Sequence, residues 1–110
     1  MSASAHGKTV FKIDRFRVPA VARNEFMERV RSIRDFLDAQ DGCGQNLVLE
    51  RAGDPDSSFV VTIVEWRDDE AFAKARAAAA ARYAATGFSP QALIERLGIV
   101  AEIGDYGLVA

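Results

Sequence analysis

Hydrophobic and polar positions alternate along this chain with two different periods, and the order of the periods predicts the fold. A period of two marks strands at residues 10–18, 45–51 and 58–66, and a looser run over 99–109 predicts a last strand. Between the first two strands the period becomes helical over residues 22–40. The apolar stripe of this helix comprises Phe26, Val30, Ile33 and Leu37.

Turn and capping residues set the remaining boundaries. Asp68 and Gly87 bracket an alanine-rich helix, and Ser89 precedes a short helix that starts at Pro90 and stops before Gly98. Residues 53–57 form a turn between two strands. The resulting order, βαββαβ with one extra short helix, predicts a ferredoxin-like α+β fold: a four-stranded antiparallel sheet with helices on one face. We expect a flexible leader at 1–8 and a single domain over 9–110.

The third strand is apolar on both faces, which is unusual for a sheet with helices on only one side. One face carries Phe59, Val61 and Ile63, and the other carries Val60, Thr62, Val64 and Trp66. We expect the first set beneath the helices and the second set on the side without helices. Because this chain has no further element to cover that side, the pattern predicts a homodimer in which two sheets pair as a dimeric α/β barrel.

Two curved sheets packed in this way should leave a cavity between sheet and helices, with a few polar groups in an apolar space. Lys12, Asp14, Thr62 and Trp66 are predicted to project towards it. Lys12 and Asp14 are two residues apart on one strand, so they share a face and should pair if that face is buried. Asp14 is then either half of a structural ion pair or a carboxylate that takes a phenolic proton from a substrate.

The alanine-rich helix presents further candidates on the turns after Phe72. Arg76, Arg82 or Tyr83 could reach the cavity mouth and bind an anionic or phenolate group, for which arginine offers a fixed fork of donors. Alternatively, Phe72 and Tyr83 pack on the sheet while Arg76 points to solvent. Helical spacing alone leaves this choice open.

Composition excludes several classes of function. The 110 residues are 49% hydrophobic and 27% charged, with a net charge of −2, which argues against a nucleic-acid partner. No apolar run approaches the roughly 20 residues that a membrane span needs. His6 and Cys43 are the only histidine and cysteine, so a histidine-activated nucleophile, a disulfide within the chain and a zinc site are not expected. We expect a cytoplasmic protein without a metal or other cofactor.

Residues 64–72, VEWRDDEAF, place a tryptophan at a strand end directly before an amphipathic helix. With the element order, this segment resembles the antibiotic-biosynthesis monooxygenase family of the dimeric α/β-barrel superfamily. The resemblance implies small homodimers with one cavity per subunit. Some members oxidise polycyclic aromatic phenols to quinones with molecular oxygen and no flavin or metal, and others cleave haem.

Trp66 matches the cavity tryptophan of the cofactor-free oxygenases that this chain resembles. Two positions depart from their pattern: Phe72 replaces a tyrosine, and Thr62 replaces an asparagine. The histidine that holds haem iron in the haem-degrading branch has no counterpart in the helix after Trp66.

The sequence-based hypothesis is therefore a cofactor-independent monooxygenase acting on an aromatic or polyketide-type small molecule. The alternative is a non-catalytic homodimer that binds a small molecule or serves a structural role. The predicted catalytic residues are Asp14 and Trp66. The predicted substrate-binding residues are Lys12, Phe16, Thr62, Val64, Phe72, Arg76 and Tyr83.

Overall fold

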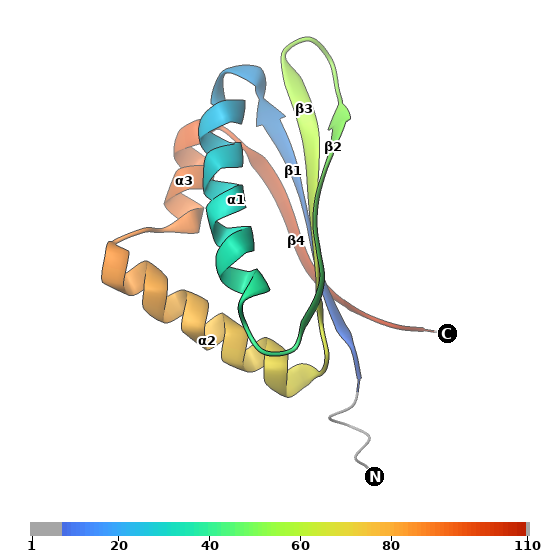
Figure 1. Ribbon diagram of the computed structural model, residues 1–110. Coiled ribbons are helices and arrows are strands. Elements are labelled where there is room, and N and C mark those ends of the chain that lie inside the picture. Colours follow the sequence, from blue (N-terminus) through green and yellow to red (C-terminus); the bar gives the residue numbers. More distant parts are fainter. Residues whose placement is uncertain (1–7, 110) are drawn as a thin grey trace.

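The computed structural model describes residues 8–109, and its elements follow the predicted order (Figure 1). The strands are β1 (Val10–Pro19), β2 (Cys43–Ala52), β3 (Ser57–Trp66) and β4 (Val100–Gly107). The helices are α1 (Arg23–Asp38), α2 (Asp69–Thr86) and α3 (Pro90–Leu97), and a 3-10 turn, η2 (Ala20–Ala22), leads into α1. The sheet is antiparallel in the order β2-β3-β1-β4, which confirms the ferredoxin-like prediction. Most of the predicted leader, including His6, lies outside the described residues.

The caps predicted for α2 and α3 are present and fix where both helices begin and end. The Asp68 carboxylate accepts a hydrogen bond from the Ala71 amide at 2.8 Å, and the Ser89 hydroxyl accepts one from the Ala92 amide at 3.1 Å. Gly87 and Gly98 close the two helices in the left-handed conformation, each with φ of +69°. Trp66 and α2 are thus joined by a two-residue connection with a defined geometry.

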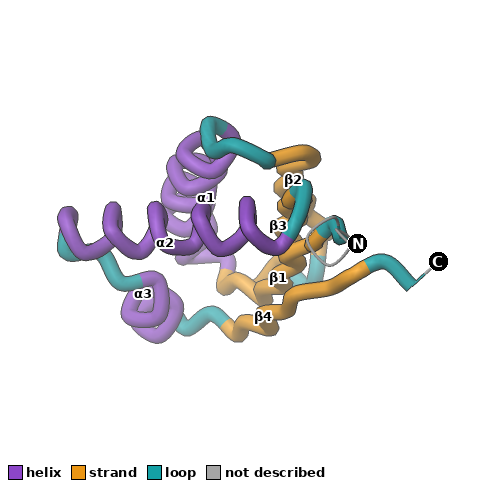
Figure 2. Tube along the Cα trace, turned by 90° about the horizontal axis from the view of Figure 1, so that it is seen from below, coloured by secondary structure: helices purple, strands orange, loops and turns teal. Residues whose placement is uncertain are grey.

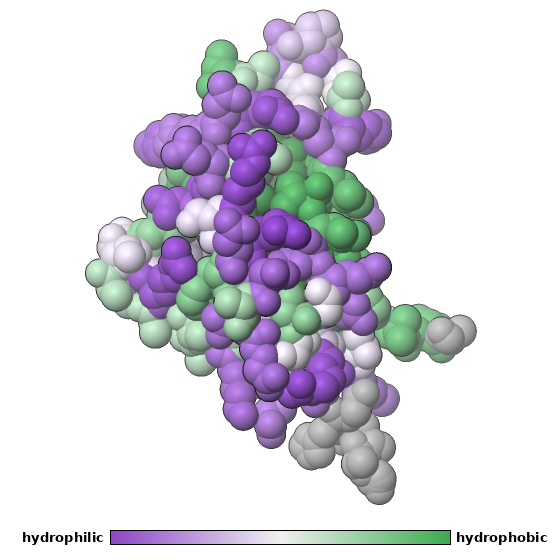
Figure 3. Space-filling model, viewed as in Figure 1, coloured by the Kyte–Doolittle hydropathy of each residue, from purple (hydrophilic) through white to green (hydrophobic). Residues whose placement is uncertain are grey.

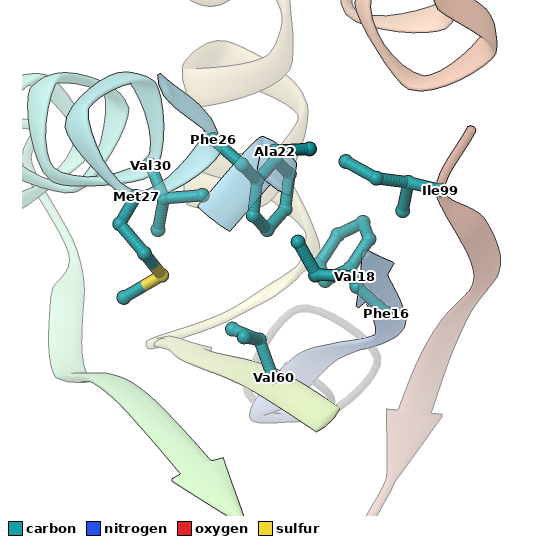
Figure 4. Packing of buried hydrophobic residues seen from close by; sticks show 8 residues of the cluster. All are labelled: Phe16, Val18, Ala22, Phe26, Met27, Val30, Val60 and Ile99. Carbon is teal, nitrogen blue, oxygen red and sulfur yellow. The ribbon is translucent and has the colours of Figure 1, made fainter. Parts of the chain in front are cut away.

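All three helices lie on one side of the sheet (Figures 1 and 2). The main core lies between α1 and the sheet, where Phe16 packs edge-on against Phe26 with ring centroids 5.0 Å apart (Figure 4). This core comprises Phe16, Val18, Ala22, Phe26, Met27, Val30, Val60 and Ile99. A second, smaller cluster under the start of α2 comprises Val10, Val64, Trp66, Phe72 and Ala75.

The helices cover the opposite face of the sheet from the one that the sequence predicted. Val60, Val64 and Trp66 lie beneath the helices, 0%, 6% and 1% exposed. Phe59 and Ile63 alternate with them and therefore lie on the face without helices. The prediction was wrong because alternation separates two faces but cannot identify the covered one when both are apolar.

The face without helices, called here the open face, is built from all four strands. Its cross-strand pairs include Ile13 with Ile63 and Phe11 with Tyr106. Its members include Phe11, Ile13, Leu47, Leu49, Phe59, Val61, Ile63 and Tyr106. Leu47 and Leu49, on the outer strand β2, are 39% and 48% exposed. Hydrophobic atoms also form a visible patch beside the hydrophilic surface of α1 (Figure 3).

Candidate functional site

A pocket of about 380 Å³ lies between the sheet and the three helices. Its walls are almost entirely apolar, with contributions from all four strands and from α1, α2 and α3. The structure brings all nine sequence-predicted site residues to this one pocket: Lys12, Asp14, Phe16, Thr62, Val64, Trp66, Phe72, Arg76 and Tyr83. Six of them converge because alternate residues of β1 and β3 face the helices, and the other three belong to α2, which covers this part of the sheet. The chemical roles assigned to them remain predictions.

The pocket is hollow because α2 covers it with small side chains. Ala75, Ala79 and Ala80 line it between the larger residues at either end of the helix. Near the start of α2, the Phe72 and Trp66 rings lie 6.5 Å apart between centroids. Near its end, Tyr83 packs edge-on against Phe88 at 5.4 Å. The two aromatic contacts support the helix at both ends, and the alanine segment between them leaves space for a ligand.

Among residues 8–109, Asp14 is the one acidic residue that lines the pocket, and its carboxylate is paired with Lys12. The Lys12 ammonium donates to both carboxylate oxygens, at 2.9 and 2.7 Å. The two side chains are 30% and 15% exposed, so the pair is largely screened from solvent. A carboxylate that is mostly buried needs such a partner, because the attraction offsets the cost of removing its charge from water. Thr62 lies directly across from Asp14 on β3 and adds a hydroxyl to the same wall.

Of the three mouth candidates on α2, two line the pocket and one does not. Arg76 lines it, with its guanidinium 5.3 Å from the Phe72 ring centroid. Tyr83 also lines it, and burial raises the pKa of its phenol, so the hydroxyl stays protonated at neutral pH. Arg82 turns away and lies over the Phe36 ring at 4.6 Å, beside a separate surface groove.

Several polar residues that line the pocket were not predicted from the sequence, among them Arg29 and Arg34 on α1 and Asn46 on β2. The Asn46 side chain is 6% exposed and donates to the Arg34 carbonyl at 3.0 Å, while the Arg34 guanidinium donates to the Asn46 carbonyl at 3.0 Å. This reciprocal pair fixes α1 against β2. Arg29 follows Phe26 by three residues and therefore lies beside the apolar stripe of the helix. This spacing was the one feature of the sequence that could have predicted its place at the pocket.

Within residues 8–109 no three histidine, cysteine, aspartate or glutamate side chains gather as metal ligands would. Over the same range, no helix has the length and apolar character required to cross a membrane. Cys43 pairs with Trp66 across β2 and β3, and its pKa is raised by burial and by the nearby Asp38 carboxylate. Its thiol is therefore mainly protonated at neutral pH.

Solved structures with the same fold extend over nearly the whole chain. SnoaB, a cofactor-independent oxygenase from Streptomyces nogalater, has a TM-score of 0.64 and 24% identity, covering 94% of this chain and 95% of its own. A dimeric ferredoxin-like protein from an uncultured marine organism has a TM-score of 0.65 and 12% identity, covering 94% and 97%. A conserved protein from Methanosarcina mazei Go1 has a TM-score of 0.63 and 16% identity, covering 91% and 92%.

The search of curated proteins finds no match. The sequence pattern of one family, described as antibiotic biosynthesis monooxygenase, matches residues 9–86. This match spans β1 through α2, and so includes both strands and the helix that carry the nine predicted pocket residues. The chain therefore belongs to the antibiotic biosynthesis monooxygenase family.

Proposed function

We propose that this chain is a homodimeric, cofactor-independent oxygenase that oxidises an aromatic or polyketide-type small molecule with molecular oxygen. One observation carries the proposal: an apolar pocket of about 380 Å³ in which a buried tryptophan lies on the same wall as a single ion pair. An apolar cavity with few convergent polar groups suits a small aromatic ligand. SnoaB, which shares the fold, is described as a cofactor-independent oxygenase.

In the proposed reaction, Asp14 takes a proton from the substrate while the apolar walls exclude bulk water. The resulting electron-rich anion transfers one electron to oxygen, and the two radicals recombine to a peroxide anion at the substrate carbon. This anion takes back the proton held by Asp14 and becomes a hydroperoxide. Loss of the remaining C–H proton and of hydroxide then leaves a carbonyl. For an anthrone, one oxygen atom ends in the new quinone carbonyl and the other in water. Trp66 and Phe72 supply the flat surfaces that orient the ring.

The proposed dimer uses the open face. This face is apolar at its centre, around Ile13, Val61 and Ile63, and no element of residues 8–109 covers it. Exposed apolar surface of this kind usually marks an interface. A solved structure of the same fold, 12% identical to this chain, is described as a dimeric ferredoxin-like protein. We also place the protein in the cytoplasm.

A second function is supported by the departures from the family pattern. With Phe72 and Thr62 in place of a tyrosine and an asparagine, the pocket lacks one hydroxyl and one amide that could hold an oxygenated intermediate. The Lys12–Asp14 contact also satisfies Asp14 without a substrate. The alternative is therefore a non-catalytic homodimer that binds an aromatic small molecule in the same pocket.

Oxygen uptake with a panel of hydroquinones and anthrones separates the two functions. An oxygenase should consume one oxygen molecule per anthrone without releasing hydrogen peroxide, and Asp14→Asn should abolish uptake while the protein still folds. Asp56→Asn, in the exposed β2–β3 turn, is the matched control and should keep full uptake. No uptake above the buffer rate with any substrate would refute the oxygenase. If Asp14→Asn lowers thermal stability and leaves uptake intact, Asp14 is only the structural partner of Lys12.

A further inference from the structure

The pocket carries a charge opposite to that of the chain. Its charged lining residues are Lys12, Arg29, Arg34 and Arg76 on the basic side and Asp14 on the acidic side. Four basic groups against one acidic group give the lining a net charge of +3. The whole chain, with 14 basic and 16 acidic residues, has a net charge of −2. A basic lining in an acidic protein favours an anionic ligand, because the local field acts on whatever enters the pocket.

Two of the four basic groups are already occupied. Lys12 is neutralised by Asp14, and Arg34 is held by the Asn46 carbonyl and lies 3.6 Å from the Asp35 carboxylate. Arg29 and Arg76 differ from them, because neither has a carboxylate within 4.0 Å among residues 8–109. Both residues are exposed while lining the pocket, so they mark its mouth.

Arg29 contacts an aromatic ring beside the pocket. Its guanidinium lies over the Phe88 ring, 3.9 Å from the centroid. A cation–π contact is made to the face of the ring and requires no N–H donor, so the five N–H donors of Arg29 can still bind an anion. Phe88 in turn packs against Tyr83, whose phenol is protonated at neutral pH and can donate to an anion at the same end of the pocket.

We infer that the ligand of this pocket is an organic anion with a flat apolar body, held by its carboxylate or phenolate group at Arg29. The body lies inward, against Trp66 and the alanine segment of α2, and the anionic group lies at the mouth with Arg29 and Tyr83 as donors. This inference rests on the proposed function in one respect only, that the pocket is the site of ligand binding. It assigns Arg29, on α1, as the residue that selects the charge of the ligand.

Titration calorimetry with naphthalene-2-carboxylate and its neutral isostere naphthalene-2-carboxamide tests the inference at neutral pH. The wild-type protein should bind the carboxylate about tenfold more tightly than the carboxamide, as expected for a charge-assisted contact with arginine. Arg29→Gln should reduce this preference to less than about twofold while leaving carboxamide affinity unchanged, and Arg29→Lys should restore part of it. Raising the salt concentration should shrink the preference, because the mouth is exposed to solvent.

Arg31→Gln is the matched control, since Arg31 is an exposed arginine of α1 that does not line the pocket. It should keep the wild-type preference. Equal affinity for the two ligands, an equal loss of both in Arg29→Gln, or the same loss of preference in Arg31→Gln would overturn the inference and leave the proposed function standing. Failure of both ligands to bind the wild-type protein would refute the aromatic pocket itself, and the inference with it.

Discussion

The two faces of the sheet share one backbone and one alternating sequence, yet they differ in what covers them. The face beneath the helices carries the buried residues Val60 and Trp66, the pocket and the Lys12–Asp14 pair. The open face carries Ile13 paired with Ile63 and no charged residue at that central position. The covered face therefore tolerates charge, because its charges are paired and border a cavity, whereas the open face is apolar at its centre and lacks cover.

This difference teaches that a charged position in a strand does not by itself identify the solvent side. The pocket on the covered face exists because α2 places alanines over it. By contrast, α1 packs the larger side chains of Phe26, Met27 and Val30 against the sheet (Figure 4). The core beneath α1 is closely packed, and the pocket opens between this core and α2, so that Phe16, Phe26 and Val30 belong to both.

The largest expected effect comes from placing a charge at the centre of the open face. Ile63→Lys should convert the proposed dimer of about twice 12.0 kDa into a monomer, because a lysine buried between two apolar sheets has no partner and costs several kcal/mol. Sedimentation at low micromolar concentration measures this change. Val21→Lys, at a residue 98% exposed on η2, is the control and should leave the mass unchanged. A wild-type monomer at that concentration would contradict the proposed dimer.

The neighbouring residues Val60 and Val61 lie on opposite faces of the sheet, so substitutions at the two positions allow the faces to be compared. Val60→Ala should lower the free energy of unfolding by about 2 kcal/mol at every protein concentration, because Val60 is 0% exposed within the subunit. Val61→Ala should instead weaken association, so its effect on urea unfolding should fade as the protein is diluted. Identical concentration dependence for the two variants would show that the two faces do not have separate roles.

A smaller effect is expected from opening the ion pair on the covered face. Lys12→Met leaves the Asp14 carboxylate, 15% exposed, without its partner and should lower the free energy of unfolding by about 1–2 kcal/mol. The double variant Lys12→Met with Asp14→Asn should recover part of that loss, since no charge is then left unpaired. Thermal denaturation of the two variants makes the comparison, and equal stability of Lys12→Met and wild type would contradict a buried pair.

The smallest effect concerns the exposed ion pair that ties α1 to β2. The Arg23 guanidinium donates two hydrogen bonds of 2.6 Å to Glu50 and lowers the pKa of that carboxyl from 4.5 to about 2. A lowered folded-state pKa stabilises the fold above the unfolded value of 4.5, and this contribution is lost as pH falls towards 2. Glu50→Gln should therefore flatten the pH dependence of stability in this interval. If Glu50→Gln leaves the dependence of the unfolding free energy on pH unchanged, solvent screens the Arg23–Glu50 pair completely.

The element order was predictable because the signals for it are local. The stripe that begins at Phe26 and the caps at Asp68 and Ser89 each act within one or two helical turns, and all three helices formed as expected. The grouping of Asp14, Thr62 and Trp66 on one face was also predictable, because it depends only on alternation along strands.

Three features were not predictable, and all depend on contacts between distant segments. Which face the helices cover is decided by how α1 packs against β1 and β3, and both faces were apolar enough to accept it. Arg29 reaches the pocket only because α1 and the loop at Phe88 meet there, although 59 residues separate them (88 − 29). Asn46 is buried for a similar reason, through its exchange of hydrogen bonds with Arg34.

The most direct test of the account is whether an aromatic ligand binds between Trp66 and the alanine face of α2. Trp66 is the only tryptophan, so its fluorescence has a single source. A soluble hydroxyanthraquinone, of the product class of the proposed reaction, should quench it saturably in the wild-type protein. Ala79→Phe, which fills the pocket, should weaken this binding at least about tenfold, as expected when a ring occupies the ligand's space. Ala77→Phe, on the exposed side of the same helix, should bind as the wild type does. Equal quenching in all three proteins would place the ligand outside this pocket and contradict the account.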